Sequence, residues 1–143
     1  MPGMNNWVFW SLLSAVFAGA TAVLAKVGVQ GIDSQVATAI RTTVILVFTW
    51  ILAAHATSFA TFGAISRKTW IFLILSGLAT GLSWICYFRA LQLGEASRVA
   101  PIDKLSVVFV IAFAAIFLGE SITWQSLAGG GLIVAGAILL AWK

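Results

Sequence analysis

Long, unbroken runs of apolar residues dominate the hydrophobic pattern of the chain. The stretch from Trp70 to Phe88, WIFLILSGLATGLSWICYF, contains no charged residue and no regular alternation of apolar and polar positions. Strands of a membrane barrel alternate with a period of two, whereas a helix needs about 20 predominantly apolar residues to cross about 30 Å of hydrocarbon. The pattern therefore predicts membrane-spanning helices. Five segments qualify: residues 7–29, 36–54, 70–88, 101–118 and 125–142.

Turn and cap residues separate these segments. The pair Asp33-Ser34 precedes the second segment and offers an N-cap, and Thr123 offers one for the last segment. Gly94 closes the third helix and Gly119 ends the fourth. Pro101 is expected in the first turn of the fourth helix, where its missing N–H is not needed.

Composition narrows the fold class. The 143 residues are 62% hydrophobic and 8% charged, against about 25% charged in soluble domains. These values exclude an ordinary soluble enzyme, a disordered tail and a disulfide-rich secreted module. We therefore expect an all-α integral membrane protein, with residues 1–143 forming one bundle of five transmembrane helices. The basic residues are isolated apart from Arg67-Lys68, so no nucleic-acid partner is expected.

The distribution of Lys and Arg predicts the orientation. Positive charge favours the cytoplasmic side. One side holds six basic residues and the other holds only Arg67 and Lys68, which predicts an outside N-terminus and an inside C-terminus. If the three residues within the bilayer are not counted, the ratio becomes three to two and both orientations remain open. The six are Lys26, Arg41, Arg89, Arg98, Lys104 and Lys143, of which Lys26, Arg41 and Lys104 are the three within the bilayer.

Charged residues inside a membrane are costly and mark candidate functional positions. Lys26 lies three residues from the end of the first segment, where snorkelling to the interface is slightly favoured over a substrate contact. Arg41 lies about two turns into the second helix, and a cavity-facing or paired role is as well supported as a structural one. Glu120 follows a helix C-terminus, which disfavours an acid. A structural pairing of Glu120 is favoured over a role in proton coupling.

Two further charges are accounted for by helix structure. Arg89 is expected to end the third helix, where a cation is favourable, and Asp103 to complement the dipole in the first turn of the fourth. His55 is the single histidine and Cys86 the single cysteine, and the chain has no nucleotide-binding loop. We therefore expect no catalytic residues, no metal site and no cofactor.

Aromatic residues divide into two groups. Trp10 and Trp84 lie deeper in their segments than a membrane-interface belt requires. Trp84 and Tyr87 share a helical face with Ser76 and Thr80, which is equally consistent with a cavity lining and with hydroxyls bonded to their own backbone. The belt itself is predicted from Trp7, Trp50, Trp70, Trp124 and Trp142.

Small residues recur at helical spacing and predict close helix packing. Gly77 and Gly81 form a GxxxG pair in the third segment. In the fifth, Gly129 and Gly136 are seven residues apart, as are Gly130 and Ala137. A further small-residue face in the first segment contains Ser11, Ser14, Ala18, Thr21 and Ala25. Small side chains allow helix backbones to approach closely in lipid, so a compact, self-associating bundle is expected.

The stretch from Ala90 to Ala141 resembles the EamA domain of the drug/metabolite transporter superfamily. The N-terminal half is consistent with it, through Trp10, Lys26 and Arg41. The matching pieces are Ala90-Leu91, Ala96–Pro101, Lys104-Leu105-Ser106, Leu118-Gly119-Glu120, Gln125 and the glycine-rich run 129–136. The resemblance implies one five-helix repeat of a fold that usually contains two inverted repeats around a substrate cavity.

This resemblance implies a prokaryotic inner-membrane transporter of small metabolites or related solutes, with export as the expected direction. One repeat needs a partner to enclose a cavity, either a second copy or a paralogue. The expected substrate pathway contains Trp10, Arg41, Trp84 and Tyr87, with Lys26 and Glu120 behind them. Two alternatives remain open: a component of a lipid-linked carrier flippase, and a membrane assembly subunit that transports nothing.

Overall fold

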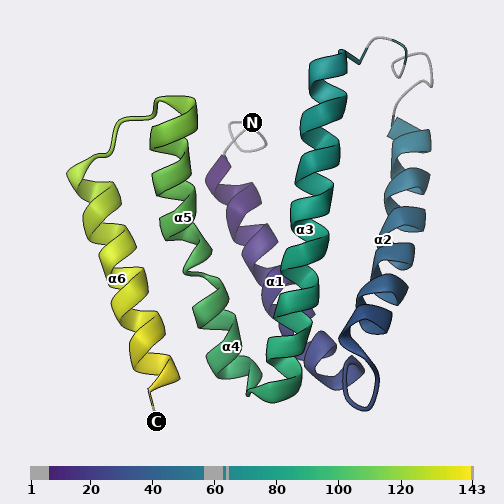
Figure 1. The fold of residues 1–143 in the computed structure, drawn as a ribbon, viewed down its shortest axis with the longest axis horizontal. Helices are drawn as coiled ribbons and strands as arrows, with labels where there is room; N and C mark the ends of the chain where they lie inside the picture. The colour runs from purple at the N-terminus through teal and green to yellow at the C-terminus, as the bar shows by residue number, and fades with distance from the viewer. Residues whose placement is uncertain (1–6, 57–62, 64, 143) are drawn as a thin grey trace. The chain divides into compact units, whose positions relative to one another are not determined.

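The computed structural model describes residues 7–56, 63 and 65–142, which form helices and the turns between them (Figure 1). No strand occurs in this described part of the chain. Five spans within it are long and apolar enough to cross a membrane, with Ala96–Leu118 counting as one. The prediction of an all-helical, multi-pass membrane protein is therefore confirmed. The elements are α1 (Trp7–Gly28), α2 (Ser34–Ala56), α3 (Arg67–Leu93), α4 (Ala96–Asp103), α5 (Ser106–Phe113), the π-helix η2 (Ala114–Leu118) and α6 (Trp124–Ala141).

The chain forms two compact units. One is Gly28–Gln92, with α2 and α3, and the other combines Met1–Val27 with Leu93–Lys143. The first unit contains the tight turn that leads into α2. Gly31 adopts a φ of +77°, a conformation that residues with a Cβ rarely adopt. Asp33 then caps α2, since its side chain accepts the N–H of Gln35 at 2.7 Å.

The third helix is longer at both ends than its apolar run suggests. Ser66 extends the start, because its hydroxyl accepts the N–H of Thr69 and its carbonyl accepts that of Trp70. At the other end α3 continues to Leu93, and Gly94 follows it as predicted. Arg89 therefore lies inside the helix and does not end it, so the interpretation of Arg89 as a C-terminal cation is wrong.

The fourth span begins five residues before Pro101, which corrects the predicted start. Glu95 is the N-cap, and its carbonyl accepts the N–H groups of Arg98 and Val99 at 3.0 Å. Pro101 consequently sits inside α4, and Asp103 is the last residue of that helix, where it pairs with Lys104 at 3.2 Å. The expected role of Asp103 at a helix start is therefore wrong.

Pro101 accounts for the division of this span. A proline inside a helix removes one backbone donor and clashes with the preceding turn. Around Lys104 and Leu105, backbone hydrogen bonds run from the N–H of residue i to the carbonyl of residue i−3. One of them joins the Leu105 N–H to the Ile102 carbonyl at 3.0 Å. Regular helix resumes at Ser106 as α5. Figure 1 shows the break between α4 and α5.

The connection to α6 has the predicted glycine and cap. η2 ends at Gly119, whose φ is +69°, and the Ala114 carbonyl accepts the N–H groups of Gly119 and Glu120. Thr123 caps α6, with its hydroxyl accepting the N–H of Ser126 at 3.1 Å. Both predicted boundaries are confirmed.

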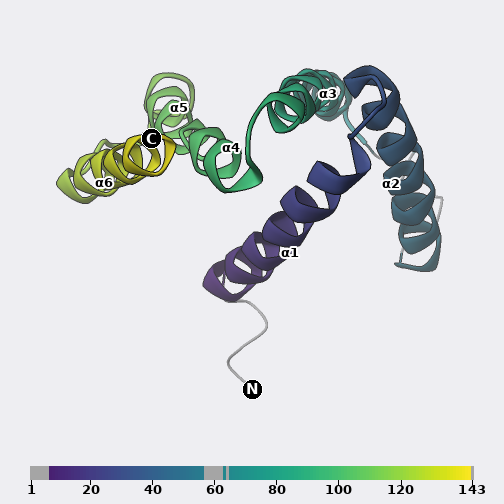
Figure 2. The same cartoon turned by 90° about the horizontal axis from the view of Figure 1, so that it is seen from below.

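α6 packs against α4 and α5, and these helices stay together in both views (Figures 1 and 2). Gly130 and Ala137 are buried, and a Cβ added at Gly130 would lie 3.4 Å from Cδ1 of Ile111. The predicted pair Gly130 and Ala137 thus lies on the packing face of α6, whereas nothing lies within 4 Å of a Cβ built on Gly129 or Gly136, the other predicted pair. Likewise, nothing lies within 4 Å of a Cβ built on Gly77 or Gly81.

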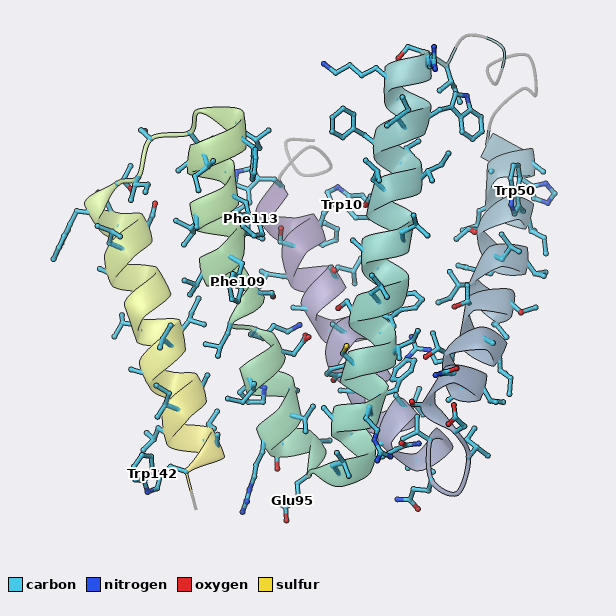
Figure 3. All side chains as sticks on the ribbon, in the orientation of Figure 1. Trp10, Trp50, Glu95, Phe109, Phe113 and Trp142 are labelled. Atoms are coloured by element: carbon cyan, nitrogen blue, oxygen red, sulfur yellow. The ribbon has the colours of Figure 1, made fainter. Side chains whose placement is uncertain are left out.

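Large apolar side chains on the helices are mostly exposed, as expected for surfaces that face hydrocarbon. Trp7, Trp124 and Trp142 lie at helix ends and are 77–83% exposed. Figure 3 shows Trp50 toward one end of α2 and Trp142 at the end of α6. These positions agree with an interfacial belt.

Candidate functional site

Arg41 is the charged residue that lies deepest in α2. The helix begins at Ser34, so seven residues at 1.5 Å each place Arg41 about 10 Å along the axis. The local sequence is compatible with helix because the Thr38 and Thr42 hydroxyls donate to the carbonyls of Ser34 and Thr38, one turn earlier. Thr38 is buried and Arg41 is half-buried, so this face of α2 is turned toward protein.

Two aromatic rings of α3 hold the guanidinium. The Arg41 Cζ atom lies 5.4 Å from the ring centroid of Trp84 and 4.7 Å from that of Phe88. Trp84 and Phe88 are four residues apart, so they occupy the same face of α3. Each cation–π contact contributes about 0.5–2 kcal/mol, toward the higher value where water is excluded. Phe88 is fully buried and anchors the cluster.

Tyr87 borders the same cluster. Its ring centroid lies 6.0 Å from that of Phe88, and it is close enough to Arg41 for an electrostatic interaction between the two side chains. Three sequence-predicted site residues, Arg41, Trp84 and Tyr87, therefore meet in one unit. Thr80, on the same face, donates its hydroxyl to the Ser76 carbonyl at 2.9 Å. That hydroxyl satisfies its own backbone, as one of the two interpretations of this face predicted.

A polar contact that sequence reasoning missed lies one turn beyond the cluster. The Gln92 amide nitrogen donates to the carbonyl oxygens of Val29 at 3.1 Å and Ile32 at 2.6 Å. Nη1 of Arg89 in turn donates to Oε1 of Gln92 at 3.1 Å. Gln92 thereby ties the end of α3 to the turn before α2. A polar amide one residue before the end of an apolar helix is the signal that could have identified it.

The remaining candidates lie in the other unit. Nζ of Lys26 donates to the Gly94 carbonyl at 2.7 Å. This hydrogen bond holds the turn that follows α3. Trp10 is half-exposed on α1 and packs edge-to-face on Phe9, with centroids 5.5 Å apart. Glu120 is exposed, and the described chain gives it no ion pair. The favoured structural pairing of Glu120 therefore has no counterpart there.

No group of three His, Cys, Asp or Glu residues able to hold a metal ion occurs in the described segments. The chemistry that the Arg41 cluster offers is instead recognition: a fixed cation beside an indole ring and a phenol, on helices able to span a membrane. A charged side chain at such depth normally faces the interior of a membrane protein or a water-filled path.

Comparison with known proteins identifies a family. Residues 5–142 match the EamA-like transporter family. An uncharacterized transporter encoded in the cobO 3' region of a Sinorhizobium species is 54% identical over 96% of this chain and 97% of its own length. The uncharacterized transporter YvbV of Bacillus subtilis is 32% identical over 95% of this chain but only 45% of its own length.

A third similarity is to a flippase subunit. The probable 4-amino-4-deoxy-L-arabinose-phosphoundecaprenol flippase subunit ArnF of Erwinia tasmaniensis is 40% identical over 49% of this chain and 57% of its own length. No solved structure matches the chain significantly.

Proposed function

The chain belongs to the EamA-like transporter family, and from this premise we propose that it moves small metabolites across a prokaryotic cell membrane. Residues 1–143 act as one five-helix transmembrane domain, and export is the expected direction. One observation carries the proposal. The guanidinium of Arg41, on the apolar helix α2, lies against the rings of Trp84 and Phe88 on α3. The chain needs no catalytic group or cofactor for this activity, so we do not expect it to be an enzyme.

The active form is a dimer, of two copies or of one copy and a paralogue. The support comes from the relative YvbV. The match covers nearly all of this chain but less than half of YvbV. A protein with about twice the length has room for two such domains. Transporter sites commonly lie between two repeats, so a single repeat requires a second one.

Within this proposal, Arg41, Trp84 and Tyr87 contact the substrate. Trp10, Lys26 and Glu120 are secondary positions on the pathway. Lys26 already donates to the Gly94 carbonyl, so its contribution is to hold the turn that follows α3. The N-terminus is proposed to lie outside and the C-terminus inside, with an antiparallel homodimer as the alternative if both orientations insert.

A second candidate function is a role as one subunit of a flippase for a lipid-linked carrier. It is favoured by the matches to two relatives named as probable flippase subunits, ArnF of Erwinia tasmaniensis and ArnE of Pseudomonas aeruginosa. Co-purification of a long-chain lipid phosphate with the protein would favour this function over transport of water-soluble metabolites.

The test is transport by purified protein in liposomes, screened against a metabolite mixture by mass spectrometry. Arg41→Ala and Trp84→Ala should abolish accumulation that the unaltered protein supports. Arg67→Ala and Trp124→Ala are matched controls, because both residues are exposed at helix starts. If folded Arg41→Ala and Trp84→Ala proteins transport normally, these residues are not in the pathway. A C-terminal reporter read on both sides of the membrane tests the orientation.

A further inference from the structure

The unit that contains Arg41 has an unbalanced charge. Residues 28–92 include four Lys and Arg residues, at positions 41, 67, 68 and 89, but a single acid, Asp33. The Asp33 carboxylate accepts the N–H of Gln35 at the start of α2. It precedes Arg41 by eight residues, about 12 Å along a helix axis. Arg41 therefore has no acidic partner from its own unit.

Within the described part of the chain, the hydrogen-bonding groups of Arg41 have no acceptor. A guanidinium carries five N–H donors, arranged in a planar fork that matches two oxygens of a carboxylate or phosphate. The rings of Trp84 and Phe88 cover part of this group, but a ring is no substitute for an oxygen acceptor. In the segments that the structure describes, no hydrogen bond or ion pair to Arg41 occurs.

The two rings differ in what they leave accessible. Phe88 is fully buried and can only support the guanidinium from within the protein. Trp84 is half-buried, so the protein does not fully enclose this residue. Among the described residues, a cation whose N–H donors have no acceptor therefore lies next to a half-buried aromatic residue.

We propose that Arg41 binds an oxyanion, a carboxylate or a phosphate, on the transported molecule, and that the exposed part of Trp84 contacts an apolar group of the same molecule. This inference rests on the proposed transport function and specifies the substrate class as amphiphilic anions. The oxyanion supplies the acceptors and the negative charge that the described residues of this unit do not provide to Arg41. A charge-assisted pair of this kind is stronger than a neutral hydrogen bond and most favourable in a two-pronged geometry.

The test is an equilibrium binding measurement in phosphatidylcholine nanodiscs, which needs no transport. The chain contains four arginines, so ¹⁵N-labelled arginine gives few side-chain signals, and Arg41→Lys assigns the one beside the aromatic rings. Phenylacetate should shift the Arg41 signal saturably. Its matched cation, 2-phenylethylammonium, and its matched alcohol, 2-phenylethanol, should not. Inorganic phosphate should shift it at higher concentration, because it lacks the apolar part.

The Trp84 indole N–H signal provides the second readout. In Arg41→Gln protein it should require at least a tenfold higher phenylacetate concentration for the same shift, whereas Arg67→Gln should leave the titration unchanged. A similar response of Arg41 to phenylacetate and to 2-phenylethylammonium would overturn the proposal. So would the absence of any saturable response to both anions and to anionic lipid.

Two sources could supply the oxyanion, and separate samples distinguish them. A saturable response in phosphatidylcholine alone identifies a solute from the aqueous phase. A response that appears only when phosphatidylglycerol is added identifies a lipid headgroup, which still supports oxyanion binding at Arg41. Because binding is measured without transport, anion binding by a protein that moves nothing would reject the proposed function while leaving this inference intact.

Discussion

Residues 28–92 and the group α4–α6 hold their helices together by different means. In the first, α2 and α3 meet through Arg41 against two rings, and Gln92 bonds to the turn before α2. In the second, α6 packs through Gly130 and Ala137, and Pro101 divides α4 from α5. The difference matters because lipid is as apolar as the helix surfaces, so apolar area alone does not select a helix neighbour.

We propose that recognition belongs to residues 28–92 and close helix packing to α4–α6. Charged and aromatic contacts are directional and leave donors that a ligand can use. Contacts between small residues are shape-dependent and offer a ligand nothing to bind. Substitutions in the two units should therefore affect different measurements, and four predictions test this from the largest effect to the smallest.

Arg41→Gln should lower the transport rate per folded protein at least tenfold, and it should also lower the free energy of unfolding because the two cation–π contacts are lost. A hydrogen bond to a charged group contributes about 1.5–3 kcal/mol, and 1.4 kcal/mol corresponds to a factor of ten. Arg98→Gln is the matched control in the other unit, because Arg98 pairs with Glu95 on the surface at 3.1 Å. Liposome uptake measures both. If Arg98→Gln lowers the transport rate as much as Arg41→Gln does, the two units do not differ in their role in recognition.

Gly130→Leu should reduce the free energy of unfolding by about 1–3 kcal/mol, because a larger side chain would have to displace Ile111. Gly131→Leu is its control, since nothing lies within 4 Å of a Cβ at that position. Denaturant unfolding in detergent compares the two. If Gly131→Leu is as destabilising as Gly130→Leu, the packing face of α6 is assigned wrongly.

Gln92→Ala should cost about 1–2 kcal/mol of unfolding free energy, because it removes the two bonds to the turn at residues 29–32. Gln35→Ala serves as control, since only the backbone N–H of Gln35 is used in a cap. Hydrogen exchange should also accelerate in the turn before α2. Unchanged exchange there would show that Gln92 does not hold this turn.

Thr123→Ala should have the smallest effect, about 1 kcal/mol, because it removes the hydroxyl that caps α6. Thr123→Ser keeps the hydroxyl and should restore the unfolding midpoint. The change should leave substrate affinity unaltered, since the cap lies in the unit assigned to packing. An effect on affinity would argue that α6 contributes to recognition.

The sequence predicts the spans well because about 20 consecutive apolar residues are long enough to cross the hydrocarbon core and too apolar for a water-facing helix. Local chemistry predicts helix boundaries at Asp33-Ser34, Gly119 and Thr123, and the structure has Asp33, Gly119 and Thr123 at helix boundaries. Pro101 does not open its helix, because the local preference of proline for a first turn competes with the helix-forming residues before it. Glu95 begins the helix earlier, and the proline is accommodated by a break that follows it.

The sequence predicts which residues belong to the candidate site, but it does not predict the contacts between them. Depth in an apolar run singles out Arg41, and helical spacing places Trp84 and Tyr87 on one face. Neither pattern predicts that Arg41 contacts Trp84, 43 positions later in the chain. Periodicity shows which residues share a helix face, but not which other helix packs against that face. The Gln92 contact was missed for the same reason, since its acceptors are backbone carbonyls that no side-chain pattern reveals.

Aqueous access to the Arg41 face of α2 tests the central claim most directly. Ile45 lies one turn beyond Arg41 on nearly the same face, whereas Thr43 is about 160° away around the helix. In a Cys86→Ser background, a membrane-impermeant thiol reagent should label Ile45→Cys in liposomes, and phenylacetate should slow that reaction. Thr43→Cys should remain unlabelled. Equal labelling of the two positions, or none at Ile45→Cys, would contradict a substrate pathway beside Arg41.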